Sequence, residues 1–535
     1  MRLLVALTLL TAGAAAQVAP DRLLNAAREP QNWLTYSGSY LSQRHTALDQ
    51  ITPANVRNLE LRWVFQAQSL EKFGVSPLVV DGTMYVTQAN NSVVALDAKA
   101  GRVFWVYQHT LPPDLKLCCG SINRGLAILG DVLFMGTLDA QLVALDARTG
   151  RPLWKTVVAD YKAGYSLTLA PLVIKDKVLI GTAGGEFGIR GFVAAYDART
   201  GKEAWRFNAV PSPGEPGHET WKNDAWKTGG GSAWLTGSYD PELNLTYWGT
   251  GNPGPDLNIA QRPGDNLYTD SLVALDADTG AMKWYFQFTP NDGADWDAVQ
   301  VPVLVNGTWN GSPRKLLYSA NRNGFFYVFD RANGQFLLGR PFVKQNWSKG
   351  LDDNGRPILA ALAPNEPVYP GMQGGTNWYS PSYSPRTGLF YVSAWEDSPT
   401  VFTPQPMTHV EGQRFMGGRG RSGTPHLRRG PINTWTEEAG HGAVVAIDPR
   451  TGLRKWAYQM HDVTDSGILT TASDLLFSGG REGYFYALDA RTGALLWKTQ
   501  VGGQVGAAPI SYQVDGKQYV AIAAGNVLFT YALRD

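Results

Sequence analysis

Six copies of one pattern, Ala-x-Asp-x-x-x-Gly-x-x-x-Trp, constrain the fold of this chain more than any other feature. The copies begin at Ala95, Ala144, Ala195, Ala274, Ala446 and Ala487. A weaker copy over residues 328–338 keeps Asp330 and Gly334 but lacks the tryptophan. In each copy an apolar segment ends at the aspartate, the glycine permits a tight turn, and the tryptophan follows on the next segment. Each copy therefore predicts a β-hairpin.

The distance between successive copies predicts how the hairpins are grouped. The aspartates of the first three copies lie 49 and 51 residues apart, a spacing that suits one four-stranded blade per copy. The 118-residue interval from Asp330 to Asp448 has room for two blades, and residues 383–391 (YSPRTGLFY) supply a degenerate hairpin there. That hairpin brings the count to eight blades. The last strands, near residues 519–531, and the segment after Trp33 could close the ring.

Composition fits this interpretation, because 59 glycines and 11% aromatic residues suit a chain of many short strands and turns. An open solenoid of hairpins is the alternative, but tryptophans at a fixed offset from the aspartate favour a closed ring. We predict an all-β fold, a single eight-bladed β-propeller with tryptophan-docking repeats over residues 17–535. Residues 403–435 carry five arginines and no repeat, so we predict a surface insertion there and, more weakly, a docking patch for an acidic partner.

The first residues have the pattern of an export signal. Arg2 precedes an apolar run from Leu3 to Leu10 and small residues that end at Ala16, which predicts a signal peptide over residues 1–16. That run is too short to span a membrane, and no later segment has the roughly 20 apolar residues that a span needs. We expect a soluble periplasmic protein. A net charge of +1 gives no electrostatic basis for binding nucleic acid or an anionic membrane.

The only two cysteines of the chain are neighbours, Cys118 and Cys119. Two adjacent cysteines cannot crosslink distant parts of a fold. They are either reduced, buried and weakly apolar, or joined in a strained ring with a flat, polarisable surface. Export to an oxidising compartment favours the disulfide.

Three short motifs follow the cysteine pair: Gly-Gly-Glu-Phe-Gly at 184–188, Thr-Gly-Asn-Pro at 250–253 and Asp-Trp-Asp at 295–297. Together with the repeats, they make the chain resemble the quinoprotein alcohol dehydrogenases. These are eight-bladed propellers that bind pyrroloquinoline quinone (PQQ) and a calcium ion. The resemblance covers nearly the whole mature chain and is to the methanol and ethanol dehydrogenase type without a haem domain.

The resemblance implies a PQQ site. Cys118 and Cys119 match the vicinal disulfide on one face of the quinone, and Trp234 matches the ring on the other face. PQQ carries three carboxylates, so its rim requires cations and hydrogen-bond donors. The residues that match this rim are Arg124, Thr168, Gly184, Gly185, Arg322 and Asn377.

The resemblance also implies a metal site and a base. Glu186 and Asn252 match the calcium ligands, which supply the hard oxygens that Ca²⁺ prefers. Asp297 matches the catalytic aspartate that takes the alcohol proton and also touches the metal, with Asp295 as the alternative base. Lanthanide-using relatives carry an additional aspartate at the position of Val299, so the valine favours calcium.

Two departures from the family pattern concern the same pocket. Many relatives have glutamate or glutamine at the position of Gly74, and some have serine at the position of Ala183. These differences weaken cofactor contacts or widen the pocket, so the preferred alcohol cannot be copied from any one relative. The chain lacks Cys-x-x-Cys-His, the attachment motif of c-type haem, so we expect electrons to pass to a soluble cytochrome c.

The sequence thus predicts a PQQ- and calcium-dependent dehydrogenase that oxidises small primary alcohols to aldehydes. A non-catalytic propeller scaffold of the cell envelope is the alternative from another class, although it has no use for the cysteine pair together with the polar site residues. A PQQ sugar dehydrogenase is a third interpretation. No His-x-x-x-His pair and no dinucleotide-binding glycine motif is present, which argues against a zinc hydrolase and a nicotinamide enzyme.

Overall fold

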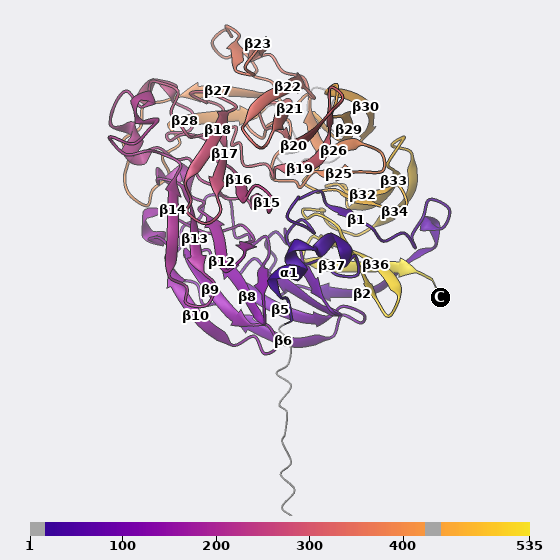
Figure 1. Ribbon diagram of the computed structural model, residues 1–535. Coiled ribbons are helices and arrows are strands. Elements are labelled where there is room, and N and C mark those ends of the chain that lie inside the picture. Colours follow the sequence, from indigo (N-terminus) through magenta and orange to yellow (C-terminus); the bar gives the residue numbers. More distant parts are fainter. Residues whose placement is uncertain (1–16, 423–439, 535) are drawn as a thin grey trace, which may run out of the picture.

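The computed structural model describes residues 17–422 and 440–534, and these residues form eight antiparallel blades arranged in a ring (Figure 1). The predicted eight-bladed β-propeller is confirmed. The proposed signal peptide at 1–16 and the end of the proposed insertion, 423–435, lie outside the described residues. No helix in the described ranges is both long and apolar enough to cross a membrane.

Four blades follow one another in the first half of the chain. They comprise β3 (Leu78–Val80), β4 (Thr83–Thr87), β5 (Ser92–Asp97) and β6 (Val103–Gln108); β7 (Ala127–Leu129), β8 (Val132–Gly136), β9 (Gln141–Asp146) and β10 (Pro152–Val157); β11 (Leu172–Ile174), β12 (Lys177–Gly181), β13 (Phe192–Asp197) and β14 (Glu203–Asn208); and β15 (Ser238–Asp240), β16 (Leu245–Gly249), β17 (Ser271–Asp276) and β18 (Met282–Gln287). In the first and third of these blades, every residue of the first strand (β3, β11) is buried, whereas about half or more of the residues of the fourth strand (β6, β14) are exposed.

The other four blades complete the ring. They comprise β19 (Val303–Trp309), β20 (Ser312–Ala320), β21 (Phe325–Asp330) and β22 (Gln335–Pro341); β25 (Ser382–Ser384), β26 (Leu389–Glu396), β29 (His441–Asp448) and β30 (Leu453–Gln459); β31 (Leu469–Thr471), β32 (Leu475–Gly479), β33 (Tyr484–Asp489) and β34 (Leu495–Gln500), with β1 (His45–Thr46) beside β31; and β35 (Ile510–Val514), β36 (Lys517–Ala524), β37 (Val527–Leu533) and β2 (Leu59–Gln66).

Short elements lie outside the blades. These are α1 (Pro20–Leu24), the hairpin of β23 (Ser348–Leu351) and β24 (Pro357–Leu359), the hairpin of β27 (Thr400–Pro404) and β28 (Gly418–Ser422), and the 3-10 turns η1 (Ala26–Arg28), η2 (Val56–Asn58), η3 (Tyr161–Ala163), η4 (Gly185–Phe187), η5 (His218–Thr220), η6 (Asp224–Thr228) and η7 (Ile259–Gln261). The described part of the proposed insertion, residues 403–422, therefore begins at the end of β27, continues through a loop and ends with β28.

The two ends of the chain close the ring within one blade. Strand β2, from the N-terminal part, pairs antiparallel with β37 from Leu59 opposite Leu533 to Gln66 opposite Val527. In Figure 1 the indigo β2 runs beside the yellow C-terminal strands. This pairing removes the exposed strand edges that an open arrangement of blades would leave.

The sequence repeat encodes the contact between adjacent blades. In the second copy, the Asp146 carboxylate accepts hydrogen bonds from the backbone and hydroxyl of Thr149, which fixes the turn before β10. Trp154 then donates its indole N–H to the carbonyl of Ala198 in the next blade, at 3.3 Å. A side chain at Gly201 would lie 2.7 Å from this indole ring, so the next turn requires glycine. Replacing a fully buried tryptophan by alanine typically costs about 3–5 kcal/mol, so we expect a smaller cost for the partly buried Trp154.

The weak seventh copy keeps the same arrangement with another side chain. Leu338 stands where the other copies have tryptophan and contacts the position of Gly452, in the turn of the next blade. The degenerate hairpin at 383–391 forms the turn between β25 and β26. These two strands belong to the same blade as β29 and β30, which carry the copy at Ala446. The assignment of two blades to the interval from Asp330 to Asp448 is therefore wrong. The total of eight is right, because β35, β36 and β37 with β2 form the remaining blade.

Candidate active site

A cavity of about 300 Å³ lies where loops from successive blades meet. Each loop leads into or out of an inner strand, so residues far apart in the sequence reach the same end of the ring. Ten of the twelve residues predicted from the sequence line this cavity: Cys118, Cys119, Arg124, Thr168, Gly184, Glu186, Trp234, Asp297, Arg322 and Asn377. Gly185 and Asn252 do not line it and lie directly beside residues that do.

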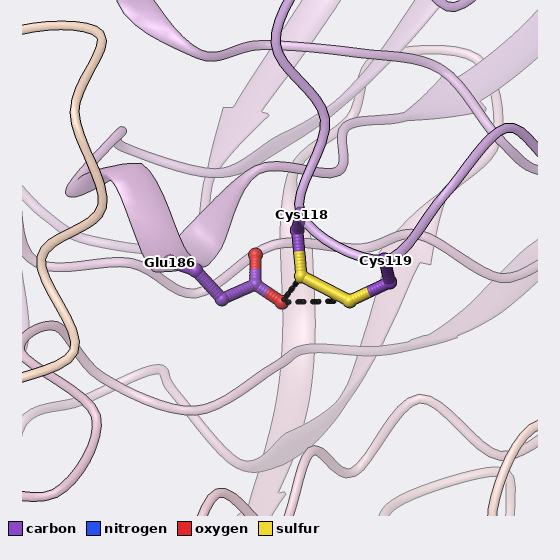
Figure 2. A group of neighbouring side chains, drawn as sticks. All are labelled: Cys118, Cys119 and Glu186. Atoms are coloured by element: carbon purple, nitrogen blue, oxygen red, sulfur yellow. Dashed lines mark hydrogen bonds between the residues drawn. A yellow bond between two sulfur atoms is a disulfide. The ribbon is translucent and has the colours of Figure 1, made fainter. Parts of the chain in front are cut away.

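One part of the cavity lining is the predicted disulfide. Cys118 and Cys119 are bonded to each other, and the Glu186 carboxylate points at them (Figure 2), with its Oε1 atom 2.8 Å from Sγ of Cys118. Disulfide sulfurs carry no hydrogen, so a hydrogen bond here requires the protonated carboxyl. Burial and the nearby Asp297 carboxylate raise the pKa of Glu186. Although both sulfurs and this oxygen lie close together, sulfurs joined in a disulfide are not thiolate ligands, and we do not assign a metal to this trio.

Arg124 is a buried cation in the cavity wall. Its guanidinium lies 4.9 Å from the ring centre of Trp234 and 5.2 Å from that of Trp378, and it donates to the carbonyl of Thr168 at 3.3 Å. Its Nε atom has no hydrogen-bond partner, and no carboxylate in the described part of the chain pairs with it. Burial lowers the pKa of Arg124 to about 10. A buried cation without a counter-ion suits an anionic ligand.

Asp297 is held by three donors. Its Oδ2 atom accepts from Nε1 of Trp234 at 3.1 Å and from Arg322 at 2.5 Å, and its Oδ1 atom accepts the backbone N–H of Asn252 at 3.0 Å. Arg322 also lies 3.6 Å from Oδ2 of Asp295. The predicted rim cation therefore contacts the predicted base directly, and Asp295 shares the same arginine at a longer distance.

The remaining predicted residues position the cavity wall. The Thr168 hydroxyl donates to the carbonyl of Trp234 at 3.3 Å. The Asn377 amide donates to the carbonyl of Gln373 at 3.1 Å. A Cβ atom at Gly184, whose φ is +114°, would lie 2.1 Å from the carbonyl oxygen of residue 164, so only glycine fits at this close approach.

The two departures from the family pattern are also visible. Ala183 lines the cavity and presents a methyl group there. A Cβ atom at Gly74 would lie 3.0 Å from Cδ1 of Ile122, and Ile122 itself lines the cavity. The isoleucine therefore occupies space that a longer side chain at position 74 would need.

Comparison with known proteins identifies the class of ligand. A family model described as glucose/ethanol/alcohol dehydrogenase, β-propeller domain, matches residues 33–341. The chain is 39% identical to quinoprotein alcohol dehydrogenase PedH of Pseudomonas putida, over 98% of this chain and 91% of the relative. The chain belongs to the PQQ-dependent alcohol dehydrogenase family. It is an oxidoreductase of that family, which argues against the scaffold interpretation.

Solved structures agree with this membership. The quinohemoprotein alcohol dehydrogenase ADHIIG of Pseudomonas putida HK5 superposes with a TM-score of 0.90 at 36% identity, covering 98% of this chain and 83% of that chain. A europium-containing methanol dehydrogenase superposes with a TM-score of 0.89 at 33% identity, covering 96% and 100%. A second family model, described as outer membrane protein assembly factor BamB, matches residues 440–535, a stretch without any of the predicted site residues.

The cavity fits PQQ by the chemistry of its walls. The disulfide and Trp234 offer polarisable and aromatic surfaces to a planar ring system, and the unpaired guanidinium of Arg124 suits one of its carboxylates. The individual roles of the site residues stay predictions. Trp378 also lines the cavity and was not predicted from the motifs. Its position directly after Asn377, a predicted site residue, could have indicated it.

A second missed feature is the segment 405–417 between β27 and β28, which we call the strap. Its backbone N–H at Phe415 donates to the carbonyl of Glu186 at 2.6 Å, and Nε2 of His409 lies 3.0 Å from the carbonyl of Phe187. Arg414 donates to the carbonyl of Cys118. The strap is thus hydrogen-bonded to the backbone of Cys118 and Glu186, which line the cavity, and of Phe187 beside them. The sequence indicated only the cluster of arginines in this region.

Proposed function

We propose that the protein oxidises small primary alcohols to aldehydes and uses PQQ as the immediate electron acceptor. The observation that carries the proposal is the cavity itself, in which the vicinal disulfide, Trp234 and the unpaired Arg124 meet beside Asp297. Family membership supports the reaction class, since PedH is named a quinoprotein alcohol dehydrogenase.

Asp297 is the proposed base. It lines the cavity with Oδ2 held by Trp234 and Arg322, and these contacts fix its orientation. From this position it accepts the hydroxyl proton of a bound alcohol. When bound, PQQ supplies the two-electron acceptor for this oxidation.

Glu186, Asn252 and Asp297 are the proposed ligands of a metal ion, with Ca²⁺ as the ion that Val299 favours. Two carboxylates and an amide oxygen are hard donors. The donor set fits, because the Coulombic influence of Asp297 on the buried Glu186 is a repulsion that a cation would relieve. The ion would act as a Lewis acid in the cavity.

A soluble cytochrome c is the proposed acceptor of the electrons, and the periplasm is the proposed location. The leader-like pattern at 1–16 and the vicinal disulfide, which an oxidising compartment favours, support the location. A cytochrome acceptor rests on the family resemblance.

Reconstitution tests the proposal. The purified full chain is incubated with PQQ and CaCl₂, and dye-linked oxidation is measured with a panel of primary alcohols, secondary alcohols and sugars. We expect one bound quinone per chain and turnover that is highest with primary alcohols. Absence of quinone absorbance after reconstitution, or turnover with sugars only, would contradict the proposed function.

A further inference from the structure

Asp256 is a buried acid to which the proposed function gives no role. Its side chain is fully buried, with 0% exposure, and neither carboxylate oxygen has a hydrogen-bond partner among the described residues. Arg262 lies beside it but donates to the backbone carbonyls of Pro255 and Asp256, at 3.0 and 2.9 Å. An unpaired carboxylate in such a place is costly for the folded chain, so a missing counter-charge is implied.

The groups that influence this carboxyl group include all three proposed metal ligands, together with Arg262. Burial, followed by the Glu186 and Asp297 carboxylates, raises the pKa of Asp256, while the Asn252 side chain opposes that shift. Asp256 follows Asn252 by four residues, on the loop between β16 and β17. A third carboxylate therefore lies within electrostatic range of Glu186 and Asp297, which themselves repel each other.

The charge balance around this point is strongly negative. Six carboxyl groups are linked here by electrostatic influence, while Arg262 and Arg322 are the buried opposing charges. Four of these acids are buried, namely Asp256, Asp270, Asp292 and Asp297, and two are half-buried, namely Glu186 and Asp295. Arg322 contacts Asp297 and Asp295. Of the other four acids, Asp256 and Asp270 have no hydrogen-bond partner for either carboxylate oxygen among the described residues. Asp256 is the one for which the Glu186 and Asp297 carboxylates are both among the main influences. A multivalent cation is the ligand that this arrangement lacks.

We propose that Asp256 is a further direct ligand of the metal ion held by Glu186, Asn252 and Asp297. The inference rests on the proposed function and extends its metal site from two carboxylates to three. Ca²⁺ accepts six to eight oxygens, so a third carboxylate completes its shell without displacing another ligand. Because Coulombic attraction scales with the charge of the ion, the same carboxylate strengthens binding of a trivalent ion more than binding of Ca²⁺.

Titration of the metal-free full chain with CaCl₂ and with LaCl₃ by calorimetry tests this assignment. We expect Asp256→Asn to raise the Kd of Ca²⁺ at least tenfold, since even residues that only support a ligand typically contribute about 10- to 100-fold. The Kd of La³⁺ should rise by a larger factor. Asp270→Asn is the matched control, because Asp270 is also fully buried with both oxygens unpaired, while the main carboxylate influences on it are Asp292 and Asp297.

The melting temperature provides a second measurement that is independent of turnover. Asparagine has the shape of aspartate without its charge, so metal-free Asp256→Asn should melt at the same temperature as the wild type or higher. Its stabilisation by added CaCl₂ should be smaller. If this variant does not fold, Asp256→Ser is measured in the same way.

The outcomes separate this inference from the proposed function. Wild-type affinity in the Asp256 variants, or an equal loss in Asp270→Asn, would overturn direct ligation while leaving alcohol oxidation intact. A wild-type chain that binds PQQ and oxidises alcohols without binding either ion would refute the inference and the proposed metal site, and would leave the proposed alcohol oxidation intact. A chain that binds neither PQQ nor metal would refute both.

Discussion

Replacement of Arg124 by methionine should separate the stability of the protein from its affinity for PQQ. Truncating one partner of a buried, hydrogen-bonded charge pair costs about 2–5 kcal/mol of binding, which at about 1.4 kcal/mol per tenfold is roughly 30-fold to several thousand-fold in the Kd. In the PQQ-free protein, by contrast, we expect the substitution not to lower the stability. The guanidinium is then a buried charge with an unpaired Nε, so the PQQ-free variant should melt no lower than the wild type.

Arg44 provides the control for this experiment. It is as deeply buried as Arg124, but it donates to the carbonyls of Tyr36 and Pro509, both at 2.7 Å, and it does not line the cavity. Arg44→Met should therefore lower the melting temperature and leave the Kd of PQQ within about threefold of the wild type, because its lost bonds are structural. Equilibrium dialysis and thermal melts measure both quantities. Wild-type PQQ affinity in Arg124→Met, or a loss of PQQ-free stability equal to that of Arg44→Met, would refute the assignment.

Three further changes test other parts of the site. Cys118→Ser opens the disulfide beside Glu186 and should weaken PQQ binding at least tenfold in dialysis, with little change in the urea midpoint, because the bridge closes only a minimal loop; a large fall in that midpoint would give the bridge a structural role. Asp297→Asn should lower kcat by about 100-fold or more with PQQ still bound, whereas Asp295→Asn should cost less than tenfold, and the opposite order would make Asp295 the base. Arg414→Ala loosens the strap and should raise the KM for alcohol by about threefold to tenfold without changing the melting temperature; steady-state kinetics that match the wild type would contradict a role for that contact.

The architecture could be predicted from the sequence because the repeat is itself the contact between blades. Trp154 needs a glycine at position 201 and an acceptor carbonyl at Ala198, so both recur at a constant distance in the chain. Closure of the ring was also predictable, since strands near the two ends have no other partner. The strap was not, because its bonds to Glu186 and Phe187 join segments more than 200 residues apart and follow no period.

The candidate site was likewise predictable only in part. Motifs located the residues that line the cavity, because each motif is a local sequence on one loop. Contacts between side chains on different loops could not be predicted from the motifs. Arg322 was expected to face the cofactor rim, yet its shortest contact is to Asp297 at 2.5 Å, a relation between residues of two different loops.

The choice of metal ion illustrates why such relations matter. The inference of calcium from Val299 rests on an assumption. It assumes that an additional carboxylate can reach the ion only from the position two residues after Asp297. Asp256 comes from a different loop, yet the Glu186 and Asp297 carboxylates influence its charge. Ion selectivity depends on the number of carboxylates that surround the ion and not on which loop supplies them. If Asp256 is a ligand, as we propose, a sequence comparison confined to position 299 leaves out one carboxylate of the site. Its removal should then weaken the binding of a trivalent ion more than the binding of Ca²⁺.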